Sequence, residues 1–152
     1  MHTRPSEARV VAAIGAIADA TELFPSEMLP DLIGGFLAEG EAEDRWLTCE
    51  GDGDVICFLY AVPEQLAEGT RNMLAIGVTP DRQGEGAGTA LTERLEADLR
   101  DEGARILLAD TSGTDAFECT RAFYAKRGYE REARIRDFWA EGDDKVTFRK
   151  AL

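Results

Sequence analysis

Three glycines at alternate positions, Gly84, Gly86 and Gly88, mark the segment of this chain that is best suited to chemistry. Glycine adopts positive φ angles without strain and lets the backbone come close to a ligand. The residues after the loop read as a helix, whose first N–H groups are unpaired and favour an anion. The pattern predicts a pyrophosphate site. The alternative is a loop whose glycines serve only tight packing.

The spacing of the glycines distinguishes between the known kinds of phosphate loop. A P-loop is excluded because no Gly-Lys-Ser/Thr follows. A dinucleotide fold requires G-x-G-x-x-G directly after the first strand, whereas here Thr89 replaces the third glycine and residues 79–83 separate the strand from the loop. Asp110 falls near the position of a ribose-binding acid, so a dinucleotide-dependent oxidoreductase stays an alternative.

The elements that must position this loop follow from apolar periodicity. The first forty residues read as helical, with apolar side chains at three- and four-residue spacing in two stretches, 10–18 and 29–37. The rest of the chain predicts, in order, strands 46–49, 55–62 and 72–78, a helix ending before Gly103, strand 106–109, a helix ending before Gly128, and strands 129–139 and 145–152.

Three local signals add detail to these elements. Residues 50–54 predict a hairpin turn. The run Asp115-Ala116-Phe117-Glu118 predicts a capping box for the last helix, with Asp115 in place of Ser or Thr. On the long helix after the glycine loop, Glu93, Glu96 and Arg100 are expected on the exposed face.

Strands mixed with helices in this order predict an α+β domain. We expect a mixed, mostly antiparallel central sheet flanked by about four helices. A chain of 152 residues suits a single domain, 1–152.

The charge of the chain bears on its partners. Lys and Arg number 17 against 30 Asp and Glu, for a formal net charge of -13. A surface this negative repels nucleic acids and anionic membranes, so neither partner is expected. It attracts cationic substrates such as amines, and adaptation to salt is an equal alternative explanation.

Cysteine and histidine usage excludes other classes of site. Cys49, Cys57 and Cys119 are widely spaced and are expected to be buried or partly buried thiols in a cytoplasmic protein. His2 is the only histidine and is expected at a mobile terminus, so neither a metal site nor a histidine triad is predicted. The chain has no long apolar run.

Two motifs resemble signatures of one known family, the GNAT superfamily of N-acetyltransferases. Gln83-x-x-Gly86-x-Gly88 matches its Q/R-x-x-G-x-G/A signature, and Ile76-Gly77-Val78-Thr79-Pro80 is similar to its lead-in strand. The run 122–129, Ala-Phe-Tyr-Ala-Lys-Arg-Gly-Tyr, resembles the second signature, a helix ending in F-Y-x-x-x-G-F/Y. The resemblance covers roughly residues 46–152, and the two N-terminal helices fit the pair that the family usually has there.

The resemblance implies that acetyl-CoA binds where strand 72–78 splays from strand 106–109. Backbone groups of Ile76 and Val78 would pair with the pantetheine arm. Many relatives carry a cofactor-contacting Asn at the position of Phe117, and here Thr120 or backbone groups would substitute for it. The cofactor-binding residues expected on this basis are Ile76, Gly77, Val78, Gln83, Gly84, Glu85, Gly86, Ala87, Gly88, Thr89 and Thr120.

The resemblance also implies roles in proton transfer. Tyr124 matches the tyrosine that acts as general acid towards the leaving thiolate, the alternative being a tyrosine that only packs in its helix. Strand 72–78 lacks the acid that several relatives use as base. Glu22 and Glu27 flank Phe24-Pro25, and Glu27 is the candidate base, although acids at a helix start are usually only solvated.

The implied activity is transfer of acetyl to a primary amine by direct attack in a ternary complex. The acceptor would be a small molecule, or a lysine or N-terminal amine of a peptide. The alternative is a non-catalytic acyl-CoA-binding regulatory module, favoured by the missing strand acid and by Phe117. Dimers are common in the superfamily, so the resemblance is compatible with a homodimer.

Several side chains near the implied site have two interpretations. Arg82, Lys126 and Arg127 would meet the 3′-phosphate of CoA or are simply solvated charges. Trp46 is expected in the core, whereas Phe138 and Trp139 line an acceptor pocket or fill the core.

Overall fold

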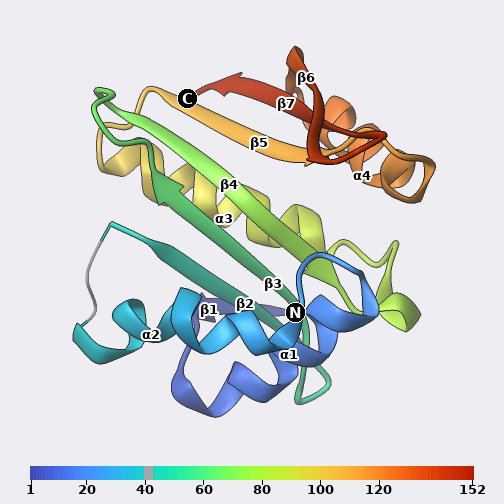
Figure 1. Cartoon of the computed structure of the whole chain (residues 1–152). Coiled ribbons are helices and arrows are strands. Elements are labelled where there is room, and N and C mark those ends of the chain that lie inside the picture. Colours follow the sequence, from blue (N-terminus) through green and yellow to red (C-terminus); the bar gives the residue numbers. More distant parts are fainter. Residues whose placement is uncertain (40–42) are drawn as a thin grey trace.

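Seven strands form one sheet in the computed structural model, which describes residues 1–39 and 43–152 (Figure 1). The order across the sheet is β1-β2-β3-β4-β5-β7-β6. Among the described strands, β4 and β5 run parallel and every other neighbouring pair is antiparallel. The strands are β1 (His2–Pro5), β2 (Arg45–Gly51), β3 (Asp54–Pro63), β4 (Thr70–Val78), β5 (Ile106–Ser112), β6 (Glu130–Ala140) and β7 (Asp143–Ala151).

Helices cover both faces of this sheet. In Figure 1, α1 and α2 lie in front of the sheet and α3 lies behind it. The α-helices are α1 (Val11–Ala20), α2 (Leu29–Glu39), α3 (Ala87–Asp101) and α4 (Glu118–Lys126). Short 3-10 turns occupy Ala8–Val10, Ser26–Met28, Pro80–Arg82 and Asp115–Phe117. The predicted α+β domain with a mostly antiparallel sheet and four helices is confirmed.

Each face of the sheet has its own apolar core. Under α1 and α2, the buried side chains include Ile14, Ile33 and Trp46, so the prediction that Trp46 fills the core is correct. The opposite core is built around α3 and includes Leu91 and Tyr124. The apolar stripes read from the sequence therefore point inward from both layers.

The sheet is open at one place, between β4 and β5. These strands pair only from Thr70 and Ile106 to Met73 and Ala109, although both continue further. The register of β3 against β4 shifts here and leaves Leu74 as a bulge between two paired residues. A bulge bends its strand, so the splay expected between these two strands is present.

The N-terminus differs from the prediction. Residues 2–5 form β1, which pairs antiparallel with β2 and places His2 opposite Glu50. The first forty residues are therefore not helical throughout, and His2 is part of the sheet edge rather than a mobile terminus. The run His-Thr-Arg-Pro carries no apolar alternation, and an edge strand needs none because water covers its outer side.

The start of α4 also differs. No side-chain cap is made by Thr114, and Asp115 lies inside the 3-10 turn, so the predicted capping box does not form. Arg121 Nη1 instead donates to the carbonyls of Ser112 and Thr114, over 2.8 and 2.7 Å. A charged donor from the next turn replaces the cap in holding this loop.

Two exposure predictions are wrong. Glu96 on α3 is only 4% exposed, because it accepts hydrogen bonds from Tyr129 Oη at 2.8 Å and Lys150 Nζ at 2.9 Å. These partners come from later segments and satisfy the carboxylate in the core. Cys119 is exposed, whereas Cys49 and Cys57 are buried as expected.

The predicted turn at residues 50–54 is confirmed and is tighter than expected. Gly51 still pairs with Asp54, so Asp52 and Gly53 alone form the loop. Both have positive φ angles, 55° and 88°, as a two-residue hairpin turn requires.

Candidate active site

A cavity of about 750 Å³ opens beside the splayed end of β4. Its wall combines the end of α1, the second half of β4, the glycine loop with the start of α3, and α4. Of the residues predicted to bind the cofactor, it is lined by Ile76, Gly77, Val78, Gln83, Gly84, Gly86, Ala87, Gly88, Thr89 and Thr120. The structure thus brings these residues to one site from three separate segments.

The glycine loop has the conformation that an anion site needs. Gly84 and Gly86 have φ angles of 81° and 93°. Gly86 is the N-cap of α3 and supplies no side-chain cap, so the first N–H groups of the helix have no capping side chain. Gln83 Nε2 donates to the carbonyl of Val78 over 3.3 Å and ties the loop back to β4. The helix start therefore faces the cavity with its donors and its positive dipole end.

Gly77 brings the β4 wall of the cavity close to α1. A Cβ at this position would lie 2.9 Å from Leu23 Cδ1 and 3.1 Å from both Ile17 Cγ2 and Phe58 Cε1. Those distances are shorter than van der Waals contact, so a side chain here would force these neighbours on α1, on the segment after it and on β3 to shift. The sequence motif pointed to Gly77 but not to this packing reason.

Three cations border the cavity, as the sequence suggested. Arg82, Lys126 and Arg127 all line it. Arg82 Nε lies 2.7 Å from Glu85 Oε2, and Glu85 itself is not among the lining residues. Arg127 Nη1 donates to Thr89 Oγ1 over 2.8 Å, and its guanidinium stands 5.7 Å from the centroid of the Phe123 ring. Arg82 is also paired with Asp52 over 3.3 Å, so the positive charge that this acidic chain presents at the cavity comes mainly from Lys126 and Arg127.

Tyr124 lies beneath the point where β4 and β5 part. It is 1% exposed and is not itself among the cavity-lining residues. Its ring centroid is 5.4 Å from that of Phe148, which pairs with Ala109 on β5. Burial, and then the negative charge of Asp110, raise the pKa of the Tyr124 hydroxyl. The hydroxyl consequently keeps its proton at neutral pH, as a hydrogen-bond or proton donor must.

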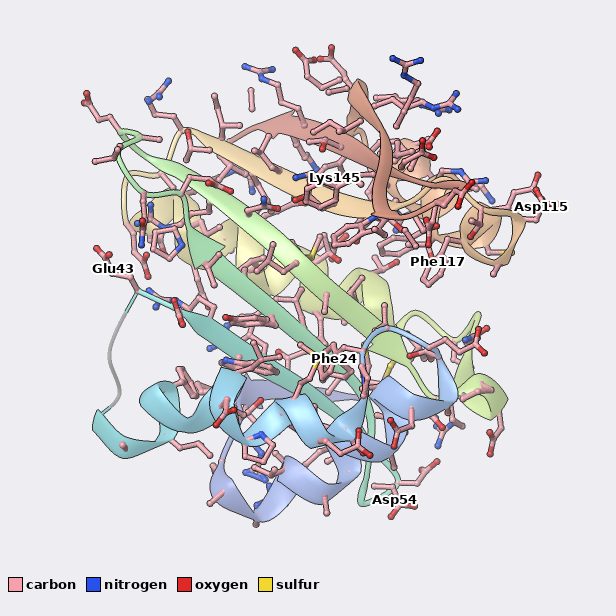
Figure 2. The ribbon with its side chains drawn as sticks, in the orientation of Figure 1. Phe24, Glu43, Asp54, Asp115, Phe117 and Lys145 are labelled. Atoms are coloured by element: carbon pink, nitrogen blue, oxygen red, sulfur yellow. The ribbon has the colours of Figure 1, made fainter. Side chains whose placement is uncertain are left out.

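The structure does not bring the predicted base into the cavity. Glu27 lies exposed in the turn Ser26–Met28 and is not a lining residue. Glu22, the other acid of that region, does line the cavity and has a φ of 56°. Phe117, labelled at the start of α4 in Figure 2, lines the cavity, as does Thr120.

Asp110 is a carboxylate whose place sequence reasoning missed. It lies on β5 directly after the last residue paired with β4, and its side chain is 4% exposed. Asn72 Nδ2 donates to Oδ2 over 2.9 Å, and Thr147 Oγ1 donates to Oδ1 over 2.8 Å. Asp110 does not line the cavity, so a ribose-binding role there is not supported. Side chains alternate between the two faces along β5, and Leu107 and Ala109 lie in the core under α3. This alternation could have predicted that Asp110 lies on the other face.

Phe138 and Trp139 do not fill the core. Each is 48% exposed, and their ring centroids are 4.7 Å apart. Of the two roles that the sequence left open for this pair, the structure excludes packing in the interior.

The site suits an elongated ligand with phosphates at one end. The unpaired edge of β4 offers backbone groups, and the start of α3 together with the three cations suits a phosphate group. Among the described residues, no group of three or more His, Cys, Asp or Glu could hold a metal ion. No helix in the part of the chain described here is long and apolar enough to cross a bilayer.

Comparisons with known proteins give one consistent result. A family model described as acetyltransferase (GNAT) family matches residues 14–129. A protein from Desulfovibrio desulfuricans assigned to the GNAT family shares 28% identity and a TM-score of 0.90, with 99% of this chain and 98% of that one covered. The comparison with curated protein sequences found no match.

More distant structures share the same fold. The ribosomal-protein-alanine N-acetyltransferase from Brucella melitensis shares 20% identity and a TM-score of 0.81, with both chains fully covered. YncA from Salmonella typhimurium, solved with its cofactor acetyl-CoA, shares 18% identity and a TM-score of 0.80, with 99% of this chain and 93% of that one covered.

Proposed function

Because the chain belongs to the GNAT family of acetyltransferases, we propose that it transfers an acetyl group from acetyl-CoA to a primary amine by direct attack. The observation that carries this proposal is the opening between β4 and β5. There the start of α3 and the free edge of β4 line one cavity, and Tyr124 lies buried beneath the point where the strands part, outside the cavity lining. Such an arrangement would hold a thioester at a fixed place, with the tyrosine as the proposed proton donor.

The cavity residues divide the binding of acetyl-CoA between them. The N–H groups at the start of α3 would hold the pyrophosphate, with Arg82, Lys126 and Arg127 beside the phosphates. Beyond Met73, the β4 edge would pair with the pantetheine arm as an added strand would. When bound, acetyl-CoA supplies an activated thioester.

Tyr124 would assist departure of the thiolate. Its hydroxyl is protonated at neutral pH, because burial and the charge of Asp110 raise its pKa. A donor placed next to the sulfur stabilises the negative charge that develops as the C–S bond breaks. The buried position of the ring, packed against Tyr129 and Phe148, fixes its direction.

The acceptor is proposed to be a cationic primary amine, either a small molecule or a lysine or N-terminal amine of a peptide. The net charge of -13 raises the local concentration of cations at the surface. The same charge disfavours nucleic acids as partners.

Release of free thiol from acetyl-CoA tests the proposal, measured across a panel of polyamines, aminoglycosides, small amines and peptides. We expect turnover with at least one amine and none when the panel is replaced by alcohols. Thermal shifts with acetyl-CoA, CoA and NAD(P) provide the second measurement. Stabilisation by CoA without turnover on any amine would contradict the enzyme and support a regulatory CoA-binding module, and stabilisation by NAD(P) alone would contradict both.

A further inference from the structure

On β5, the first residue beyond the stretch paired with β4 carries a carboxylate. Met73 and Ala109 form the last β4–β5 pair, and Asp110 is the next residue. Leu107 and Ala109 belong to the core under α3, so Asp110 points to the opposite face of the sheet, where α1 and α2 pack. Tyr124 belongs to the α3 side. The two groups therefore approach the opening from opposite faces.

Asp110 and Tyr124 are close enough to affect each other electrically. The charge of Asp110 contributes to the raised pKa of Tyr124. Phe148, whose ring contacts Tyr124, pairs across the strands with Ala109, the neighbour of Asp110. A proton donor and a carboxylate thus flank the same break in the sheet, which is the arrangement that a reaction needing both an acid and a base requires.

Asp110 lies in a nearly closed polar environment. Its two oxygens accept from Asn72 Nδ2 and Thr147 Oγ1, while Lys145 Nζ lies 3.5 Å from Oδ2. The other hydrogen bond of Asn72 Nδ2 goes to Glu64 Oε1 over 2.8 Å. A buried carboxylate costs free energy unless it is paired, so a sheet that needed only stability would be served as well by an apolar side chain here.

The third partner of Asp110 is an ammonium group. Lys145 Nζ stands 4.3 Å from the centroid of the Phe138 ring as well as beside Asp110. A carboxylate and an aromatic face together form a site that favours a primary ammonium ion. At 3.5 Å the ion pair is longer than a hydrogen bond, and the Lys145 side chain is 20% exposed. The lysine is therefore held by the charge of Asp110 and by the aromatic face rather than by a short hydrogen bond to the carboxylate.

The β6–β7 hairpin places the aromatic part of this site. Residues 136–139 of β6 are not part of the β6–β7 ladder, although Asp137 N donates to Asp144 Oδ1 of β7 over 2.9 Å. Trp139 Nε1 donates to the carbonyl of Thr111 over 3.3 Å and anchors this stretch to β5. Phe138 stacks edge-on against Trp139 and lies over Lys145. Figure 2 shows Lys145 on the side of the sheet turned towards the viewer, with Phe24 of the α1–α2 connection on the same side.

We propose that Asp110 and the Phe138 ring form the subsite for the ammonium group of the acceptor, that Lys145 occupies this subsite in the empty enzyme, and that Asp110 takes the proton the acceptor must lose. The inference rests on the proposed acetyl transfer. It assigns the missing base to β5, in place of Glu27.

The proton transfers balance with these groups. The acceptor ammonium displaces Lys145 and gives one proton to the Asp110 carboxylate. The nitrogen lone pair forms a C–N bond to the thioester carbon, and the C–S bond breaks with its electron pair going to sulfur, which takes the proton of the Tyr124 hydroxyl. The second nitrogen proton restores that hydroxyl as the amide forms, and Asp110 releases its proton to solvent.

Substitution of Asp110 tests the subsite directly. Asp110→Asn keeps the shape but loses the charge. Its amide oxygen can still accept from Asn72 Nδ2, and its NH2 group can donate to the Thr147 hydroxyl, which then accepts instead of donating. We expect kcat/KM for the amine to fall about 10²-fold or more, while the Kd for CoA stays within about twofold of the parent, since Asp110 does not line the cavity. Asp98→Asn is the matched control, because Asp98 pairs with Arg94 on α3, away from the site. Unchanged turnover in Asp110→Asn would overturn the inference.

Substitution of Lys145 supplies a test of opposite sign. If Lys145 competes with the acceptor, Lys145→Met lowers the KM of the amine about threefold or more, because the free fraction of the subsite rises. The groups that still face Asp110 are Asn72 with Glu64 behind it, Thr147 and Tyr124. A raised or unchanged KM would make Lys145 a structural residue and overturn the proposal.

These outcomes are separable from failure of the proposed function. Parent enzyme that binds CoA but acetylates no amine contradicts acetyl transfer itself. Parent enzyme that turns over, with Asp110→Asn equally active, contradicts only the assignment of Asp110. Asp110→Asn is judged unfolded if it loses the CoA-dependent stabilisation. In that case Lys145→Met tests the proposal: a lower KM for the amine supports it, and a raised or unchanged KM contradicts it.

Discussion

Tyr124 shows how the surroundings of one side chain set what it can do. A tyrosine in water has a pKa near 10 and holds its proton at neutral pH, but it can point anywhere. Here the rings of Phe123, Tyr129 and Phe148 fix its direction, and burial with the charge of Asp110 raises its pKa further. The residue is therefore a positioned and permanently protonated donor.

Tyr124→Phe isolates that hydroxyl. The ring and its packing stay, so the fold and the Kd for acetyl-CoA should change little, while kcat falls about 10²-fold or more because the thiolate loses its donor. Because the pKa of Tyr124 is raised, the parent should show no loss of kcat from tyrosine ionisation up to about pH 10. The measurement is thiol release against pH, with isothermal titration of CoA as the check on folding. A variant with parental kcat would remove Tyr124 from the mechanism.

At the scale of elements, the site depends on how closely α1 approaches β4. Gly77 permits that approach, since three side-chain atoms lie within 3.1 Å of where its Cβ would be. The end of α1 and the second half of β4 both line the cavity. The shape of the cavity thus depends partly on residue 77 being a glycine, which has no side chain.

Gly77→Ala should move α1 away from β4. We expect a loss of about 1–3 kcal/mol in unfolding free energy from overpacking, and a weaker Kd for CoA because β4 forms one wall of the cavity. Chemical denaturation and CoA titration measure the two effects. Gly34→Ala is the matched control. Nothing lies within 4 Å of its Cβ, and α2 should gain about 0.5–1 kcal/mol from the better helix former. Equal behaviour of the two variants would argue against packing as the reason for Gly77.

The same scale shows what could be predicted from sequence. The glycine loop and the helix that carries Tyr124 were predictable because each rests on a local pattern with a fixed spacing, whereas the splay was expected only from the family resemblance. The strand β1 was not, since edge pairing leaves no apolar alternation in His-Thr-Arg-Pro. Glu96 read as exposed because its partners, Tyr129 and Lys150, lie more than thirty residues away in the chain. The place of Asp110 was missed for the same reason, as Asn72 and Thr147 are also distant.

The whole molecule consists of two parts of one sheet. Strands β1–β4 with α1, α2 and α3 form one part, and β5–β7 with α4 form the other. Four residue pairs join β4 to β5. A polar cluster adds a second connection on the α3 side. Lys150 of β7 donates to Glu96 of α3 and to the carbonyl of Arg127 after α4, each over 2.9 Å. The helix that carries Tyr124 is thereby tied to both parts.

Lys150→Met should loosen this connection. Removing one partner leaves the buried Glu96 carboxylate with Tyr129 and a more distant Arg100, so unfolding free energy should fall by about 3 kcal/mol or more. The double variant Glu96→Leu, Lys150→Met should recover much of the loss, since it buries no unpaired charge. Denaturant midpoints of the parent, the single variants and the double variant measure the coupling. A single variant as stable as the parent would show that the cluster adds no net stability.

The exposed thiol at the mouth of the cavity has a practical consequence. Cys119 is exposed and lines the cavity, whereas Cys49 and Cys57 are buried, and burial raises the pKa of the Cys57 thiol. A mild alkylating dye should therefore label one position and leave the other two untouched. Occupancy of the cavity would shield that position, so the rate of labelling reads out ligand binding in the native chain without any engineered probe.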